Sequence, residues 1–461
     1  MITNLDWLEK GSVYPPVCEN NRIENYKLNE QLFLTKHKEA LQEHFHEIAR
    51  KTRKKNYDVD TVINYQQLLS KKTADFVCGE PPTLETEQDT DKLDKLLEQQ
   101  NFDTRLYEAF IDVSRYGNAI VKFVGKRLTA VSPQYWFPIV DKSDLKTITQ
   151  HVIAYPITPD DKGKMTELYV EIHDIGKVEQ RTYSFDSDKS EVGTLIEIKV
   201  DQTTLKDFAI QVLTNITHSG SVYGIDDYAI INSIVAKIMW RLHCIDNVLD
   251  KHSDPSLSGP SSALSYDDKF QRYYLDFGKY FKRDSNEDPD TKYITWDGNL
   301  DSAYKEIDTL LTQLYTLSEM GQAFMEGGGG GSADSGTALK LRMVSPRIKA
   351  ERLKSINTAT VKTTISILAH ANGIPIDPHN LQITWNDGLP DDEVEETNRL
   401  ISATGGKAIM SQYSALKSMG LTDKQAEAEL EQMAEEQANS MPVMLSSIDK
   451  HEENKVEGGE D

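Results

Sequence analysis

The sequence feature that most constrains this chain is a run of five consecutive glycines, Gly327 to Gly331, within residues 326–336. Glycine adopts positive and negative φ with similar ease, so such a run cannot hold one backbone conformation. We therefore predict a flexible loop here, with the residues Gly327, Gly328, Gly329, Gly330, Gly331, Ser332, Asp334 and Gly336. A glycine-rich segment is by itself also typical of a plain linker.

The segment after the glycines is basic, although the whole chain has a formal net charge of −23. Residues 337–371 hold one acid, Glu351, and seven bases, which are Lys340, Arg342, Arg347, Lys349, Arg352, Lys354 and Lys362. Apolar periodicity predicts a helix over this segment. Pro346 predicts a kink near Val344 and Ser345, because proline removes a backbone hydrogen bond and crowds the preceding turn. A flexible loop that leads into a basic helix suggests that a polyanion passes nearby.

Composition limits the classes of protein that the chain can belong to. Its 461 residues are too many for one small core and predict two to four subdomains. The N-terminus does not resemble a signal peptide, and the longest apolar run, residues 229–240, is interrupted by Asn232 and Lys237. We expect a soluble protein without a membrane partner. Its three cysteines, Cys18, Cys78 and Cys244, are too scattered for a disulfide framework or a zinc site and fit a reducing cytoplasm.

The acidic balance also bears on nucleic acid. Tight binding to a phosphate backbone requires neutralising Lys or Arg side chains, which an excess of acids opposes. The charge therefore argues against a protein that coats nucleic acid. It suits a surface or channel that repels phosphate and allows it to slide.

The N-terminal half predicts helices followed by strands. Residues 22–53 form one or two helices, 62–77 another, and 91–115 a third. His44 and His46 within the first segment face different directions on a helix, so a surface position explains them better than metal binding.

From residue 118 the pattern becomes typical of strands. Residues 118–124 predict a strand, and residues 128–140 predict a strand, a turn and a strand. Residues 168–172 and 196–200 alternate apolar with polar side chains, as half-buried antiparallel strands do. We therefore predict an α+β half with a β-meander over residues 118–215.

Two apolar stripes at helical spacing follow. The first consists of Tyr228, Ile231, Val235, Ile238, Leu242, Ile245 and Leu249, and the second of Tyr304, Ile307, Leu310, Leu311, Leu314 and Leu317. Each stripe predicts an amphipathic helix. Residues 251–299 between them contain short strand candidates at 273–277 and 293–296. Two interpretations stay open: a hairpin-like unit with a protruding β tip, or an ordinary antiparallel helix pair with a decorated loop.

The C-terminal part predicts a strand at 381–385, a turn at 387–390, and helices at 391–403, 407–419 and 423–438. Thr422 and Gln425 have the spacing of a capping box for the last of these helices. Beyond Asn439 the polar, acidic tail predicts disorder.

No catalytic constellation is found in the sequence. Five Gly-Lys pairs occur, but none is followed by the Ser or Thr that a P-loop needs for magnesium. The carboxylate pair Asp160-Asp161 and the cluster Asp391-Asp392-Glu393 could suggest a two-metal nuclease. Adjacent carboxylates in so acidic a chain are better explained as helix N-termini or solvated surface. We expect no enzyme activity, no cofactor and no metal.

Several short patterns occur in a characteristic order between about residues 22 and 438. They are Asn64-Tyr65, Gly79-Glu80-Pro81-Pro82, Tyr116-Gly117-Asn118-Ala119, Pro133-Gln134, Gly224-Ile225-Asp226-Asp227-Tyr228, Ser335-Gly336-Thr337-Ala338-Leu339 and Asp387-Gly388-Leu389-Pro390-Asp391. In this order the chain resembles portal proteins of the tailed bacteriophages, of the type found in long-tailed siphoviruses. It departs from the family pattern in its very glycine-rich loop and its short crown region.

The resemblance implies a mainly helical α+β fold and a ring, usually of twelve subunits, at one vertex of the capsid. The implied parts are an α+β wing at 1–224 and 337–400, stem helices at 225–250 and 301–325, a small α/β clip at 251–300, a tunnel loop at 326–336, a helical crown at 401–438 and a disordered acidic tail at 439–461. The implied partners are other copies of the chain, double-stranded DNA in the channel, terminase, head completion proteins, and major capsid and scaffolding proteins. The implied location is the virion, after assembly in the host cytoplasm.

Alternatives to these roles stay open. Lys340 and Arg342, which the resemblance places near DNA, could instead pair with acids of neighbouring subunits. The protein could also be a structural adaptor or scaffold of a virion that does not contact DNA. A metal-dependent nuclease is the third class.

Overall fold

A computed structural model describes residues 1–51, 59, 61–86, 90–253, 256–260, 265–274, 280–283, 292–294, 300–321, 343–386, 401–404, 410–419, 421 and 423–440. The chain divides into two compact units, Met1–Gly388 and Leu389–Asp461. The first unit combines helices with several antiparallel sheets, and helices predominate in the described residues as a whole. The predicted α+β class is confirmed.

Short helices begin the first unit. They are η1 Asp6–Leu8, η2 Val17–Glu19, α1 Asn20–Phe33, α2 His37–Ala40, α3 Gln42–Lys51, α4 Tyr65–Cys78, α5 Thr90–Gln99 and α6 Phe102–Tyr116. The prediction of one helix over 91–115 was wrong. The chain breaks at Asn101, whose φ of 49° lies in the left-handed region that ends a right-handed helix and that asparagine tolerates.

Asn64 explains why α4 begins at Tyr65, three residues after the predicted start at 62. Its side-chain oxygen accepts a hydrogen bond from the N–H of Gln67 at 2.8 Å, which caps the helix. Its amide donates to the carbonyl of Leu32 at 3.0 Å and to the hydroxyl of Thr35 at 2.9 Å. One asparagine thus starts α4 and joins it to the end of α1.

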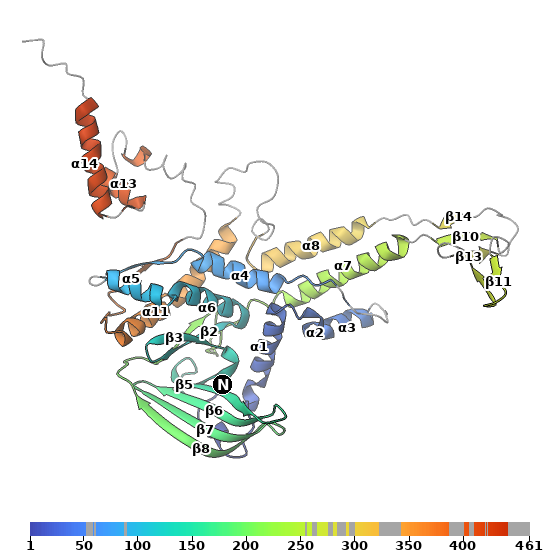
Figure 1. The fold of residues 1–461 in the computed structure, drawn as a ribbon, viewed down its shortest axis with the longest axis horizontal. Coiled ribbons are helices and arrows are strands. Elements are labelled where there is room, and N and C mark those ends of the chain that lie inside the picture. Colours follow the sequence, from blue (N-terminus) through green and yellow to red (C-terminus); the bar gives the residue numbers. More distant parts are fainter. Residues whose placement is uncertain are drawn as a thin grey trace, which may run out of the picture. The chain divides into compact units, whose positions relative to one another are not determined.

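Two antiparallel sheets follow in the chain. The first has the order β3-β2-β9, with β2 Asn118–Val124, β3 Arg127–Val131 and β9 Ile210–Thr214. The second is a meander of β4 Trp136–Val140, β5 Ile148–Pro159, β6 Met165–Asp174, β7 Lys177–Asp186 and β8 Glu191–Gln202, in chain order (Figure 1). A 3-10 turn, η3 Pro133–Tyr135, joins β3 to β4. The predicted strand, turn and strand over 128–140 and the meander over 118–215 are confirmed.

The five-stranded sheet is covered on both faces over β4 to β6. One face packs Phe137, Val152 and Val170 against Tyr14 and Ile23 of the N-terminal segment. The other face packs Trp136 and Ile153 against Ile120 and Ile210 of the three-stranded sheet. Strand β8 differs from this pattern and corrects the prediction, because residues 194–200 are exposed instead of half-buried.

Two of the short sequence patterns meet in space. Gly117 follows α6 with φ 82°, and a Cβ there would lie 2.2 Å from the carbonyl oxygen of Gly224. The side chain of Asn118 accepts a hydrogen bond from the N–H of Gly224 at 2.9 Å. Both glycines are therefore required by a close backbone contact, which brings residues 224–228 against the end of α6.

The helix pair that the two apolar stripes predicted is present. Helices α7 Asn232–Ser253 and α8 Asp301–Leu317 lie side by side (Figure 1). α7 begins at Asn232 instead of residue 225. Its lead-in is a turn in which Asp226 accepts hydrogen bonds from the N–H groups of Tyr228 and Ala229, at 3.0 and 2.9 Å.

The described parts of the insertion between the two helices are mainly short strands. They are β10 Ser256–Pro260, β11 Ser265–Asp267, β12 Arg272–Tyr274, β13 Tyr280–Arg283 and β14 Lys292–Ile294. They form a sheet of order β13-β10-β14 and a separate β11-β12 pair. The strand candidates at 273–277 and 293–296 thus overlap described strands.

The rest of the first unit is the long helix α11, Val344–Ala371, and strand β15, Gln382–Thr384, which pairs with β1, Thr83–Glu85. In the second unit, residues 401–404 are helical, α13 covers Gln412–Ser418 and α14 covers Asp423–Ser440. α13 begins later than the predicted start at 407, after a cap in which Ser411 accepts from the N–H of Ser414 at 3.1 Å. Residues 387–400, Thr422 and the tail beyond 440 lie outside the described residues.

Candidate functional site

The candidate site is the junction at which the lead-in to α7, the residues just after α8 and the first half of α11 meet. The described chain leaves this junction at Gly321, after α8, and returns to it at Met343, before α11. The predicted loop residues, Gly327 to Gly331, Ser332, Asp334 and Gly336, and the basic pair Lys340 and Arg342 lie outside the described residues. The structure therefore describes the residues on either side of the segment 322–342, which contains the predicted tunnel loop.

Pro346 is the one predicted site residue within the described part. It is buried in the first turn of α11, whose first N–H groups have no partner inside the helix in any case. Proline therefore costs little there. The kink stays a prediction, because residues 322–342 before the helix lie outside the described residues.

An apolar core forms the base of the junction. From α7 and its lead-in it takes Tyr228, Ile231, Val235, Ile238, Met239 and Trp240, and from the end of α8 it takes Leu310, Leu314 and Met320. These residues pack against the N-terminal helices, namely against Leu32 of α1, Leu41 just before α3, Phe45 of α3 and Leu69 of α4. The base of the helix pair is therefore inserted into the N-terminal helices, where burial of each large apolar side chain stabilises it by roughly 1.5–3 kcal/mol.

Asp227 lies at the centre of the polar part of the junction. Its carboxylate accepts hydrogen bonds from the hydroxyl of Ser114 at 2.7 Å, the amide of Asn215 at 3.1 Å and the ammonium of Lys349 at 2.8 Å. Ser114 also bonds Ser70, which in turn bonds the hydroxyl of Tyr228 at 2.8 Å. The network joins α4, α6, the lead-in to α7, and α11.

Lys349 extends this network to the end of α8. Its side chain is 3 % exposed, and its ammonium also donates to the carbonyl of Ser318 at 3.4 Å. Asp227 is 13 % exposed, so the pair is largely removed from water. A charge so buried is costly unless it is paired, which makes each partner necessary to the other.

A second ion pair joins the same two ends of the chain. Arg352 of α11 donates to both carboxylate oxygens of Glu319, one of them at 3.2 Å from Nη1. Two-point contacts of this kind fix orientation as well as distance. Glu319 lies before residues 322–342 and Arg352 lies after them, so this pair joins the described residues on the two sides of that segment.

α11 is also fixed to the rest of the first unit. Lys354 is buried and donates to the carbonyl of Asn386 at 2.6 Å. The amide of Asn357 bonds both backbone groups of Thr214, accepting from its N–H at 2.7 Å and donating to its carbonyl at 3.0 Å. The side chain of Asn357 therefore makes the two backbone hydrogen bonds that a neighbouring strand would make at the end of β9.

These contacts correct part of the interpretation of the basic segment. Of its bases, Lys349, Arg352 and Lys354 are bound to acids or carbonyls of the same chain and serve the junction. Arg347 is exposed and Lys362 is partly buried. The positive charge of this segment is therefore not a patch open to a polyanion as a whole.

Glu306 of α8 joins this helix to α7. It binds Lys237 at 3.2 Å and Nε of Arg241 at 3.0 Å, both on α7. Burial alone would raise the pKa of Glu306, but the hydrogen bonds from Lys237 and Arg241 outweigh it and lower the pKa. The carboxylate thus stays ionised and holds the helices in register.

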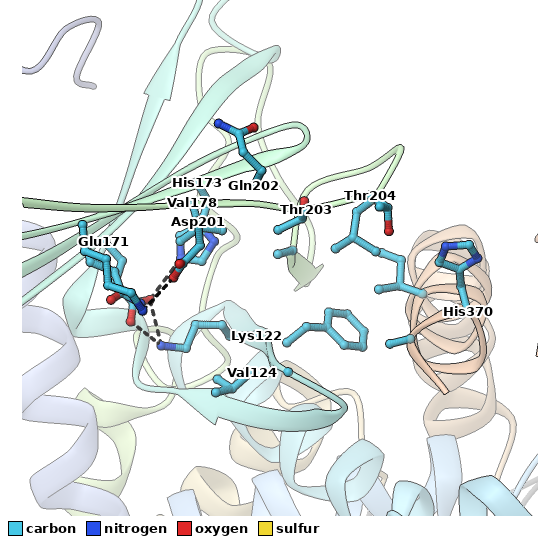
Figure 2. Close-up of a pocket in the computed structure, with 18 residues that line it drawn as sticks. Lys122, Val124, Glu171, His173, Val178, Asp201, Gln202, Thr203, Thr204 and His370 are labelled. Atoms are coloured by element: carbon cyan, nitrogen blue, oxygen red, sulfur yellow. Dashed lines mark hydrogen bonds and ion pairs between the residues drawn. The ribbon is translucent and has the colours of Figure 1, made fainter. Parts of the chain in front are cut away.

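A separate pocket of about 650 Å³, lined by both polar and apolar residues, lies between the two sheets and the end of α11. Figure 2 shows Lys122 directed at Glu171, with ammonium-to-oxygen distances of 2.9 and 2.8 Å, and His173 beside them. Burial alone would raise the pKa of Glu171, but the hydrogen bonds from His173 and Lys122 outweigh it and lower the pKa to about 2. This cluster joins β2 to β6 and is a structural ion pair between the sheets.

The described residues show no group of three or more His, Cys, Asp and Glu side chains placed to hold a metal ion. His44 and His46 lie on α3, where His46 is exposed and His44 partly so. Within the same described parts, no helix combines the length and apolarity needed to cross a bilayer.

The central pair was not found from the sequence. Asp227 was noted as part of a short pattern and Lys349 as one of several bases, but the two lie 122 positions apart. The signal that could have pointed to them is local. Lys349 falls on the apolar face of a predicted helix, between Pro346 and Leu353, where a lysine must find a partner.

These features define a class of protein: a helix pair with a β insertion, set on an α+β unit and followed in the chain by a long third helix. A sequence profile of the family described as phage portal protein, SPP1 Gp6-like, matches residues 17–443. The chain belongs to this family. No curated protein sequence matches it.

Solved structures from gene transfer agent (GTA) particles resemble the chain at low identity. A chain from the neck of an empty GTA particle, computed with C6 symmetry, is 11% identical, with a TM-score of 0.44, over 77% of this chain and 90% of that one. A chain from the virion of a native GTA particle is 11% identical, with a TM-score of 0.41, over 77% and 88%. One from a native GTA neck, computed with C12 symmetry, is 12% identical, with a TM-score of 0.40, over 77% and 88%.

Proposed function

We propose that this protein is the subunit of a portal ring at a capsid vertex, through whose channel double-stranded DNA is packaged and ejected. The observation that carries the proposal is the junction. Lys349 and Arg352 of α11 bind Ser318 and Glu319 at the end of α8, so the described residues before and after the segment that contains the predicted tunnel loop are joined to each other. Membership in the portal family supports the same function.

The division between a fixed base and a glycine-rich tip fits a channel that must let DNA move. A buried ion pair and an apolar core would keep the described residues on either side of the segment in place under load, while a glycine run in the segment adds few side chains that could grip phosphate. In this proposal the loop limits the width of the channel and does not bind a particular sequence.

Charge supports the same mechanism. Each chain carries a formal net charge of −23, so copies around a common axis would repel duplex DNA from most of the channel wall. Weak contacts lower the barrier to sliding, because each strong ionic contact must be broken as the duplex advances. Lys340 and Arg342 would then be local contact points near the loop.

The insertion between α7 and α8 is the proposed clip, which would meet terminase during packaging and head completion proteins afterwards. Its strands are short and its described sheet has three strands, so a partner can add to it without disturbing the helix pair. The wing is the proposed contact with major capsid and scaffolding proteins. Both assignments follow from family membership and chain order.

Two measurements test the proposal. The mass of the purified, assembled protein should equal a whole number of subunits, with twelve expected, and negative-stain images should show a central hole. DNA packaged per head should fall in a Lys340→Ala/Arg342→Ala variant whose ring assembles normally. Unchanged packaging with weakened rings would mean that these bases pair with neighbouring subunits. If loss of the protein impairs particle assembly but leaves the amount of packaged DNA unchanged, the structural adaptor is favoured.

A further inference from the structure

Strand β8 carries apolar side chains on the face of the sheet that forms the core elsewhere. The pairing of β6 with β7 and of β7 with β8 aligns Ile198 with Val170 and Val200 with Ile172. Residues directly opposite each other on neighbouring strands point to the same face of a sheet. Val170 and Ile172 are buried against the N-terminal segment on that face.

The core does not extend to β8, so its apolar side chains stay uncovered. Leu195, Ile198 and Val200 are 49 %, 52 % and 45 % exposed, although Leu195 lies opposite the buried Tyr183 of β7. We call these three residues the β8 strip. Contiguous exposed apolar residues on one strand face are typical of a surface that another protein covers.

The backbone of β8 is open as well. It is the last strand of the sheet. In the described part of the chain, its outer edge pairs only near its beginning, where Gly11, Ser12 and Tyr14 bond residues 190 and 192. From Gly193 onward the edge can accept another strand, and long edge strands with an apolar face commonly add a chain in this way.

The charges around the strip select the kind of partner. Glu179 is bound by Lys177 at 2.8 Å and by Arg181 at 2.6 Å, and Lys199 lies 3.1 Å from Asp201. These charges are paired locally and offer no cationic surface to a polyanion. Two copies of a chain with net charge −23 repel each other over most of their surface, so a neutral apolar strip is where they can meet.

We propose that the β8 strip is buried against a neighbouring copy of this chain. The inference rests on the proposed ring. In a cyclic ring, each subunit contacts its two neighbours through two different surfaces. The β8 strip is one of these two surfaces and seals the wings of neighbouring subunits to each other.

The test uses two variants of the full chain with equal change in charge. Ile198→Glu places a carboxylate on the strip, and Lys199→Gln removes one positive charge from the opposite face of the same strand. The concentration at which half the protein is assembled is measured by sedimentation velocity, and folding of the subunit is checked by circular dichroism. We expect Ile198→Glu to raise this concentration by about tenfold or more and Lys199→Gln to change it little.

Hydrogen exchange of the wild-type protein provides a second measurement that does not depend on a variant. Amides of residues 193–202 should exchange more slowly in the ring than in dissociated subunits. Rings that form equally well with Ile198→Glu, or no added protection of 193–202, would overturn the role of the strip and leave the ring proposal standing. Protection that arises only when another virion protein is added would overturn the assignment to a second copy. A wild-type chain that never assembles would overturn the ring and the strip together.

Discussion

The buried pair of Lys349 and Asp227 provides the sharpest test of the junction. Lys349→Met keeps a side chain of similar length and removes the ammonium group. It leaves Asp227 with the hydroxyl of Ser114 and the amide of Asn215 as donors. Asp227→Asn instead leaves the Lys349 ammonium buried with a neutral amide and with the carbonyl of Ser318 at 3.4 Å.

The size of the effect follows from distance and burial. Unit charges separated by 2.8 Å attract by about 6 kcal/mol at an effective dielectric constant of about 20, before the cost of desolvation is subtracted. Removing one partner of a buried pair typically costs about 3–5 kcal/mol. We expect Lys349→Met at the lower end of this range, because Asp227 keeps two donors, and Asp227→Asn at the upper end.

Urea unfolding followed by tryptophan fluorescence measures both losses, since Trp240 is buried in the adjacent core. The control is Lys199→Met, which removes a lysine that is 61 % exposed in its pair with Asp201 and should cost about 1 kcal/mol or less. The double variant Asp227→Asn/Lys349→Met should lose about 1–3 kcal/mol less than the sum of the single variants. A Lys349→Met protein no less stable than the control would refute the reasoning.

Three further predictions test other parts of the first unit. Gly117→Ala should destabilise the protein by more than the roughly 1–3 kcal/mol that a strained backbone costs, because the new Cβ would lie 2.2 Å from the carbonyl oxygen of Gly224. The control is Gly125→Ala, which is also at positive φ but in open space and should show the backbone cost alone. Equal melting temperatures of the two variants would contradict this prediction. Asn64→Ala should cost about 1 kcal/mol or more in urea unfolding through loss of the α4 cap, and no loss would mean that α4 does not depend on it. Burial and the nearby His173 lower the pKa of His151 from 6.5 to about 3, so the unfolded chain alone takes up this proton and stability should fall as pH drops from 6.5 toward 3, by at most about 1.4 kcal/mol per unit. His151→Asn should remove that part of the pH dependence, and an unchanged pH profile would contradict the assignment.

Local patterns predicted the elements that depend on neighbouring residues in sequence. The apolar spacing of Ile307, Leu310 and Leu314 gave α8, since a stripe of this period must face a core whatever that core is. The strand-like pattern of residues 118–124 likewise predicted β2. The break between α5 and α6 was missed because it depends on the left-handed conformation of Asn101, and most asparagines in proteins do not adopt that conformation.

Contacts between distant residues could not be predicted in this way. Asp227 and Lys349 are each ordinary in their local sequence, and only the fold brings them together. Strand β8 shows a different limit. Its alternation indicates correctly that one face of the strand is apolar, but it does not indicate whether the same chain covers that face, and within the subunit Ile198 and Val200 are exposed.

The most direct test of the central claim is a reconstruction of the assembled particle by electron cryomicroscopy. The account predicts a closed ring in which α7, Asn232–Ser253, and α8, Asp301–Leu317, of every subunit surround one central channel. The predicted tunnel loop, residues 326–336, would then lie at the inner side of the ring. A particle in which these two helices lie on the outer rim, away from a shared axis, would contradict it.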